Sequence, residues 1–155
     1  MDASNEFSTL ATLHRGFSHM PGELKLSNGR LSFTAHGPGE FWMRQLRALE
    51  RDTHQPGLAQ KVANGETVKV FDAPRREVTV SFNRLGAMKL AVGDLDCRIG
   101  FYDLALLKKM PKLSNSPIGA VISLVKALIF LPKTLSESSA ALERARVWKA
   151  LLIKK

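Results

Sequence analysis

The residue types that most often carry catalysis or bind metals are scattered along this chain without the spacing that such sites need. His14, His19, His36 and His54 form no His-x-x-x-His or Cys/His pattern, so we expect no metal site. No serine stands in a Gly-x-Ser-x-Gly turn, and there is no phosphate-binding glycine loop. Cys97 alternates with apolar residues, which predicts a buried packing residue rather than a nucleophile. We therefore expect a protein that is not an enzyme and binds no cofactor.

The cationic residues are chemically more informative. Residues 106–155 hold ten Lys/Arg and two Asp/Glu, a balance of +8 within a total net charge of +9. Such a segment favours an anionic surface, either lipid headgroups or a phosphate backbone. Arg75 and Arg76, in a predicted turn at residues 73–76, are a second candidate, although adjacent turn arginines are usually only solvated. The candidate anion-binding residues are Lys108, Lys109, Lys112, Lys126, Lys133, Arg75 and Arg76.

An apolar segment, residues 118–131, lies among these lysines. Ser116-Pro117 before it and Pro132 after it are typical helix boundaries. Fourteen helical residues would extend about 21 Å, which is too short for a hydrocarbon core of about 30 Å. We expect the segment either to insert along a membrane surface or to cover an open end of the β-structure. Its bulky residues are Ile118, Val121, Ile122, Leu124, Val125, Leu128, Ile129, Phe130 and Leu131.

A β-hairpin at residues 22–35 is the most clearly specified of the elements that would position these residues. Asn28-Gly29 is a preferred pair for a two-residue type I′ turn, because both central positions need positive φ. With Ser27 opposite Arg30, the apolar residues of both arms share one face. Those residues are Leu24, Leu26, Leu31 and Phe33.

Further strands are predicted at residues 7–18, 67–72, 78–82, 87–92 and 97–101, from alternation of apolar and polar residues between turn signals. Together with the hairpin they make about seven short antiparallel strands in two groups. This pattern is typical of a sandwich or a small barrel. The first of these strands alternates poorly.

Helices are predicted between and after the strands. Residues 40–53 and 58–62 form a helical insertion at about 40–62. Its arginines, Arg44, Arg47 and Arg51, are expected to face solvent. A last helix begins at Ser136 or Ser138 and runs to about Ile153. Its apolar stripe contains Ala141, Leu142, Ala145, Trp148 and Leu152, and we expect it either to pack on the strands or to form a dimer contact.

Three segments resemble the pleckstrin-homology superfold, in particular its GRAM-like and bacterial PH-like branches. Residues 22–33 (GELKLSNGRLSF) are similar to the opening G-x-L-x-L-T-x-x-R-L-x-F of those domains. Residues 70–82 (VFDAPRREVTVSF) are similar to their strand, D-x-P, strand corner, and residues 86–101 continue the likeness. The resemblance implies an α+β protein, mainly β, in which residues 7–105 form an antiparallel barrel with the insertion. Residues 106–155 would follow as a basic helical region.

The resemblance does not extend to the usual inositol-phosphate pocket. Members that bind phosphoinositides carry a basic cluster, K-x(n)-K/R-x-R, in the first hairpin loop. The tight turn at residues 27–30 supplies Arg30 alone. The whole chain also looks like actinobacterial proteins of this type, which implies a cytoplasmic bacterial protein.

These observations favour a module that associates peripherally with an anionic membrane surface through residues 106–155. The single cysteine permits a reducing compartment, and the first sixteen residues lack a signal-peptide pattern, so we expect the cytoplasmic face of the membrane. An alternative is a protein-interaction module that uses the helix at 40–53 or the final helix, with a possible homodimer through the latter. Non-specific nucleic-acid binding by the basic tail is weaker, because residues able to stack on bases are sparse there.

Overall fold

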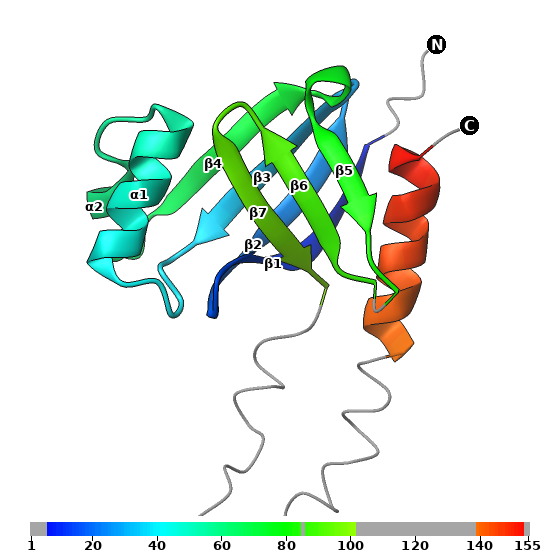
Figure 1. Ribbon diagram of the computed structural model, residues 1–155, viewed down its shortest axis with the longest axis horizontal. Coiled ribbons are helices and arrows are strands. Elements are labelled where there is room, and N and C mark those ends of the chain that lie inside the picture. The colour runs from blue at the N-terminus through cyan, green and yellow to red at the C-terminus, as the bar shows by residue number, and fades with distance from the viewer. Residues whose placement is uncertain (1–5, 85, 102–138, 154–155) are drawn as a thin grey trace, which may run out of the picture.

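The computed structural model describes residues 6–84, 86–101 and 139–153. Seven antiparallel strands form one sheet in the order β4-β3-β2-β1-β7-β6-β5 (Figure 1). The strands are β1 (Phe7–Arg15), β2 (Ser18–Ser27), β3 (Arg30–His36), β4 (Thr67–Pro74), β5 (Thr79–Phe82), β6 (Met88–Val92) and β7 (Leu95–Gly100). The prediction of a mainly β, α+β protein with about seven strands is therefore confirmed.

The hairpin of β2 and β3 has the predicted register. Ser27 pairs with Arg30, and Leu24 pairs with Phe33. Asn28 and Gly29 have φ values of 52° and 72°, as a type I′ turn requires. Gly22 at the other end of the hairpin has no room for a side chain, because a Cβ atom there would lie 2.4 Å from the ring of Phe33.

The sheet is open, and in this respect it differs from the predicted barrel. β4 and β5 stand at opposite ends of the strand order and are not hydrogen bonded to each other within the described ranges. β1 joins the two groups of strands, because it pairs with β2 along its length and with β7 at Thr12, Leu13 and His14. On the side of β5 away from β6, the C-terminal helix takes the place of a further strand (Figure 1).

Three α-helices accompany the sheet: α1 (Met43–Thr53), α2 (Leu58–Ala63) and a C-terminal helix described over residues 139–152. α1 begins three residues later than predicted, because Trp42 has an extended backbone with ψ at 159°. Its N–H donates to the side-chain oxygen of Gln45 at 2.9 Å, which closes the first turn. The predicted turn at 73–76 is instead the end of β4 followed by a short 3₁₀ helix, η1 (Arg75–Glu77).

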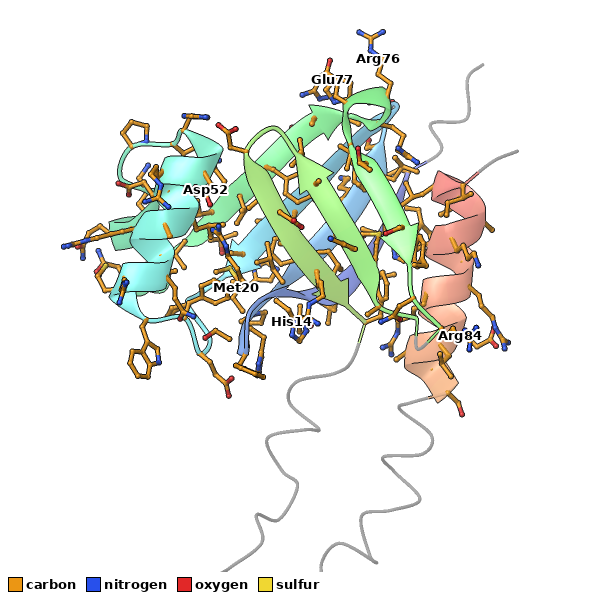
Figure 2. The ribbon with its side chains drawn as sticks, viewed as in Figure 1. His14, Met20, Asp52, Arg76, Glu77 and Arg84 are labelled. Carbon is orange, nitrogen blue, oxygen red and sulfur yellow. The ribbon has the colours of Figure 1, made fainter. Side chains whose placement is uncertain are left out.

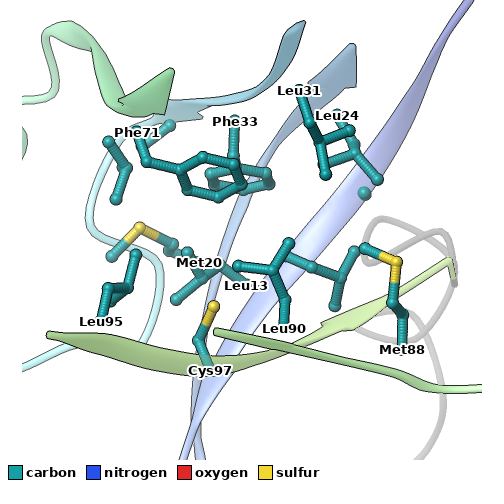
Figure 3. Close-up of a cluster of buried hydrophobic side chains, with 14 of the residues drawn as sticks. Leu13, Met20, Leu24, Leu31, Phe33, Phe71, Met88, Leu90, Leu95 and Cys97 are labelled. Carbon is teal, nitrogen blue, oxygen red and sulfur yellow. The ribbon is translucent and has the colours of Figure 1, made fainter. Parts of the chain in front are cut away.

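The core lies on the concave side of the sheet. Figure 3 shows Leu13, Leu24, Phe33 and Leu90 packed together from four strands, and all are fully buried. Cys97 belongs to this cluster, and burial raises the pKa of its thiol to about 12. It is a packing residue, as the alternation of β7 indicated, and a thiol with so high a pKa is a poor nucleophile.

The C-terminal helix packs against the body through the predicted apolar stripe. Ala141, Ala145, Trp148 and Leu152 are buried, whereas Leu142 is 38% exposed. The indole N–H of Trp148 donates to Oγ1 of Thr9 at 2.9 Å. The stripe therefore packs on the strands, which was one of its two expected roles.

Candidate functional site

Most of the residues that the sequence singled out for binding lie outside the described ranges. These are Lys108, Lys109, Lys112, Lys126 and Lys133, together with the apolar segment at 118–131. Their contribution stays a prediction. Of the candidate cations, Arg75 and Arg76 are the two that the structure places.

Arg75 holds the end of the C-terminal helix. Its guanidinium donates to the carbonyl oxygen of Val78 at 2.8 Å and also to that of Leu152. The last carbonyl groups of a helix carry partial negative charge, so a cation there is stabilising. Arg76 is exposed and projects away from the sheet (Figure 2). The two arginines line a shallow hollow of about 600 Å³ with Gly29 and Leu152. Arg75 donates two hydrogen bonds within the protein, and its Nε is buried without a hydrogen-bond partner among the described residues.

Three exposed apolar side chains lie near one end of the molecule. Phe17, at the β1–β2 turn, is fully exposed, Trp42 is 78% exposed and Met43 is 37% exposed. We call these three residues the aromatic corner. The β1–β2 turn and the start of α1 lie at the same end of the molecule (Figure 1). A single exposed apolar side chain is ordinary, whereas several at one end of a molecule favour a binding role.

Hydrogen bonds fix the two parts of the aromatic corner to each other. The amide nitrogen of Gln45 donates to Oγ of Ser18 at 2.8 Å, and the amide oxygen of Gln45 accepts the Trp42 N–H. The backbone N–H of Glu40 donates to the carbonyl oxygen of His19 at 2.9 Å. The turn that carries Phe17 and the residue that begins α1 are therefore held as one unit.

Two exposed cations follow Trp42 and Met43 in the first turns of α1. Arg44 and Arg47 of α1 are exposed, and neither forms an ion pair with another residue of the described ranges. Glu40 is the acidic residue nearest in sequence to Trp42, and its carboxylate lies 2.9 Å from Nδ1 of His19. Arg15 pairs with Asp52 of α1, and the hydrogen bond from Arg15 lowers the pKa of that carboxyl.

Sequence reasoning did not find the aromatic corner. The strand predicted at 7–18 includes Phe17, and the helix predicted at 40–53 includes Trp42, so neither residue stands out in the sequence as exposed. The available signal was Gly16, because glycine favours tight turns, and its φ of 61° in the structure agrees with a turn there. The local sequence around Gly16 does not show that the β1–β2 turn contacts the start of α1.

His14 lies on the outer face of β1 beside β7 (Figure 2). Its Nε2 lies 2.6 Å from Oγ1 of Thr12, and that hydroxyl is 3.3 Å from the carbonyl oxygen of Gly100. Burial, and then the charges of His19 and Arg98, lower the pKa of His14 from 6.5 to about 4. The imidazole is therefore neutral at pH 7.

We expect the free energy of unfolding to fall by about 1 kcal/mol between about pH 7 and about pH 5, after allowance for the partial exposure of His14. The unfolded chain, with a His14 pKa near 6.5, binds this proton more readily than the folded chain, whose pKa is about 4. Stability is therefore lost as the pH falls through this window. Urea unfolding at both pH values measures the effect, and His14→Gln should flatten it. An equal pH dependence in the variant would assign the effect to other groups.

Within the described ranges, no group of three or more His, Cys, Asp or Glu side chains is arranged to hold a metal ion. Nor does any helix of those ranges combine the length and apolar character needed to cross a membrane. Comparison of the chain with models of protein families, with curated proteins and with solved structures finds no match.

Proposed function

We propose that this protein is a non-enzymatic binding module that associates peripherally with an anionic membrane surface. The observation that carries the proposal is the aromatic corner, in which exposed Phe17 and Trp42 stand on two hydrogen-bonded loops. Tryptophan is favoured at the boundary between headgroups and acyl chains, because its ring is apolar and its indole N–H can stay hydrated. Phenylalanine is common on the apolar face of segments that enter this boundary.

The charges near the corner support the same proposal. Arg44 and Arg47 are exposed next to Trp42 and Met43, where they would meet lipid phosphates as the rings enter the interface. Each cation near an anionic leaflet adds about 1 kcal/mol to binding. The net charge of +9 would also draw the protein toward such a surface from solution. In this proposal the cationic and apolar residues of 106–131 are a second contact with the membrane.

The proposed scaffold is a PH/GRAM-like domain on the cytoplasmic face of the membrane. The number of antiparallel strands and the packed C-terminal helix agree with what the resemblance implies, and they support the assignment, whereas the open sheet departs from the implied barrel. A helical insertion between β3 and β4 would then be the part that presents Trp42.

Sedimentation of the full chain with vesicles tests this function. The protein should sediment with vesicles of phosphatidylcholine mixed with phosphatidylserine, less so at high salt, and should stay in the supernatant with phosphatidylcholine alone. If it stays in the supernatant with both, the membrane proposal is wrong. Specific capture of a protein by α1 or the final helix, or a salt-sensitive shift of random DNA, would then favour one of the alternatives.

A further inference from the structure

The outer face of β1, β7 and β6 carries a row of ionisable side chains. His14 of β1 lies opposite Arg98 of β7, and Arg98 lies opposite Lys89 of β6. We call these three residues the cationic row, in which Lys89 and Arg98 carry the charge and His14 is neutral at pH 7. Residues directly opposite on neighbouring antiparallel strands have Cβ atoms about 5 Å apart, and like charges at such positions destabilise a sheet.

No carboxylate of the described ranges forms an ion pair with Lys89 or Arg98. Both side chains are exposed. Arg98 donates one hydrogen bond, to the carbonyl oxygen of Gly16 at 3.0 Å. The rest of its guanidinium and the Lys89 ammonium therefore remain available to an anion.

The cationic row lines an open hollow of about 320 Å³. Arg15, Gly16, Asp96 and Cys97 complete the lining. One guanidinium nitrogen of Arg15, Nη1, is buried without a hydrogen-bond partner in the part of the chain that the structure describes. Asp96 is the acidic member of the lining, and it does not neutralise either cation of the row by an ion pair.

The hollow and the aromatic corner are continuous along the chain. Gly16 lines the hollow, and Phe17 follows it directly at the β1–β2 turn. A phenylalanine ring that enters the acyl boundary would therefore stand beside a cationic hollow at the depth of the headgroups.

We propose that this hollow binds a phosphate group, supplied either by a lipid headgroup or by a free phosphate. Arg98 would contact two phosphate oxygens through its planar fork, and Lys89 would add a second charge. A bound phosphate would also relieve the repulsion between these two opposed cations. If a lipid headgroup supplies the phosphate, the inference rests on the proposed membrane association, and the lipid phosphate is the group that the hollow recognises at the membrane surface.

Titration of the full chain with inorganic phosphate, followed by NMR, tests the site itself. Amide signals of His14, Lys89 and Arg98 should shift together, and the pKa of His14 should rise from about 4, because a neighbouring anion favours the imidazolium. Lys89→Gln with Arg98→Gln should weaken the binding about tenfold or more. The matched control, Lys61→Gln with Arg84→Gln, removes the same charge from two other exposed residues and should leave the binding within about twofold. An equal loss in the control, or no response to phosphate, overturns the proposal.

Vesicles identify the source of the phosphate. Phosphatidic acid exposes a phosphomonoester, whereas phosphatidylserine carries a phosphodiester. At equal surface charge, the protein is compared on phosphatidylcholine vesicles that contain either phosphatidic acid or phosphatidylserine. A preference for phosphatidic acid that the Lys89/Arg98 variant loses indicates that a lipid headgroup supplies the phosphate. Binding of inorganic phosphate without binding to either vesicle indicates a free phosphate, and then the proposed function fails while the site stands. Vesicle binding that survives in the Lys89/Arg98 variant, with no response to phosphate, overturns the site and leaves the proposed function intact.

The Lys89/Arg98 variant is expected to fold, because both side chains are exposed. If it does not, Lys89→Gln alone, together with the phosphate titration of the unmodified chain, decides the question.

Discussion

Replacement of Trp148 by alanine is expected to lower the free energy of unfolding by about 3–5 kcal/mol. Trp148 is fully buried, and its ring centroid lies 5.0 Å from that of Phe7 and 6.4 Å from that of Phe101. The substitution leaves a cavity among these rings and leaves Thr9 without the indole donor. Domains of this size are stable by only about 5–15 kcal/mol, so the variant should lose a large part of its stability.

Urea unfolding at one temperature measures this effect. Val147→Ala is the matched control, because its side chain is the neighbour of Trp148 but is 42% exposed. The control should lie within about 0.5 kcal/mol of the unmodified chain. If the Trp148 variant unfolds at the same urea concentration as the control, the C-terminal helix does not stabilise the sheet in the way that its contacts indicate.

Replacement of Phe17 and Trp42 by serine is expected to weaken binding to anionic vesicles about a hundredfold or more. Removal of each large apolar side chain from a membrane interface forfeits about 1.5–3 kcal/mol of transfer free energy, and a tenfold change in affinity corresponds to about 1.4 kcal/mol. The stability of the protein should not fall, because both side chains are already exposed in solution and serine is a favoured residue at the N-cap position of Trp42. Vesicle sedimentation and urea unfolding measure the two quantities separately.

Leu10→Ser is the control for the aromatic corner. Leu10 is 74% exposed but precedes Phe17 by most of the length of β1, about 20 Å at strand spacing. It should therefore leave vesicle binding unchanged. Equal losses in the control and in the Phe17/Trp42 variant would mean that general surface hydrophobicity, rather than this corner, governs the association.

Local patterns predicted the elements whose determinants are local. Asn28-Gly29 and the alternation on both sides of it specify the turn and register of β2 and β3 without any distant contact. The alternation of β7 likewise predicts that Cys97 faces the core. The stripe that includes Ala145 and Trp148 predicts which face of the last helix packs, although not what it packs against.

The candidate site could not be read from the sequence because it depends on non-local contacts. The aromatic corner exists because Ser18 and Gln45 bond to each other, which no spacing within one segment specifies. The cationic row requires the pairing of β1 with β7, whose residues are far apart in the chain. Whether the sheet closes into a barrel is also a non-local property, because it depends on whether β4 and β5 pair with each other.

Tryptophan fluorescence tests the membrane proposal most directly, because the chain has two tryptophans in contrasting environments. Trp148 is fully buried and Trp42 is 78% exposed, so a change in environment on binding should come from Trp42. On addition of vesicles of phosphatidylcholine mixed with phosphatidylserine, the emission should shift to shorter wavelength and be quenched by brominated acyl chains, and Trp42→Phe should abolish both changes. Sedimentation with these vesicles while Trp42 stays as water-exposed as in solution would contradict the account.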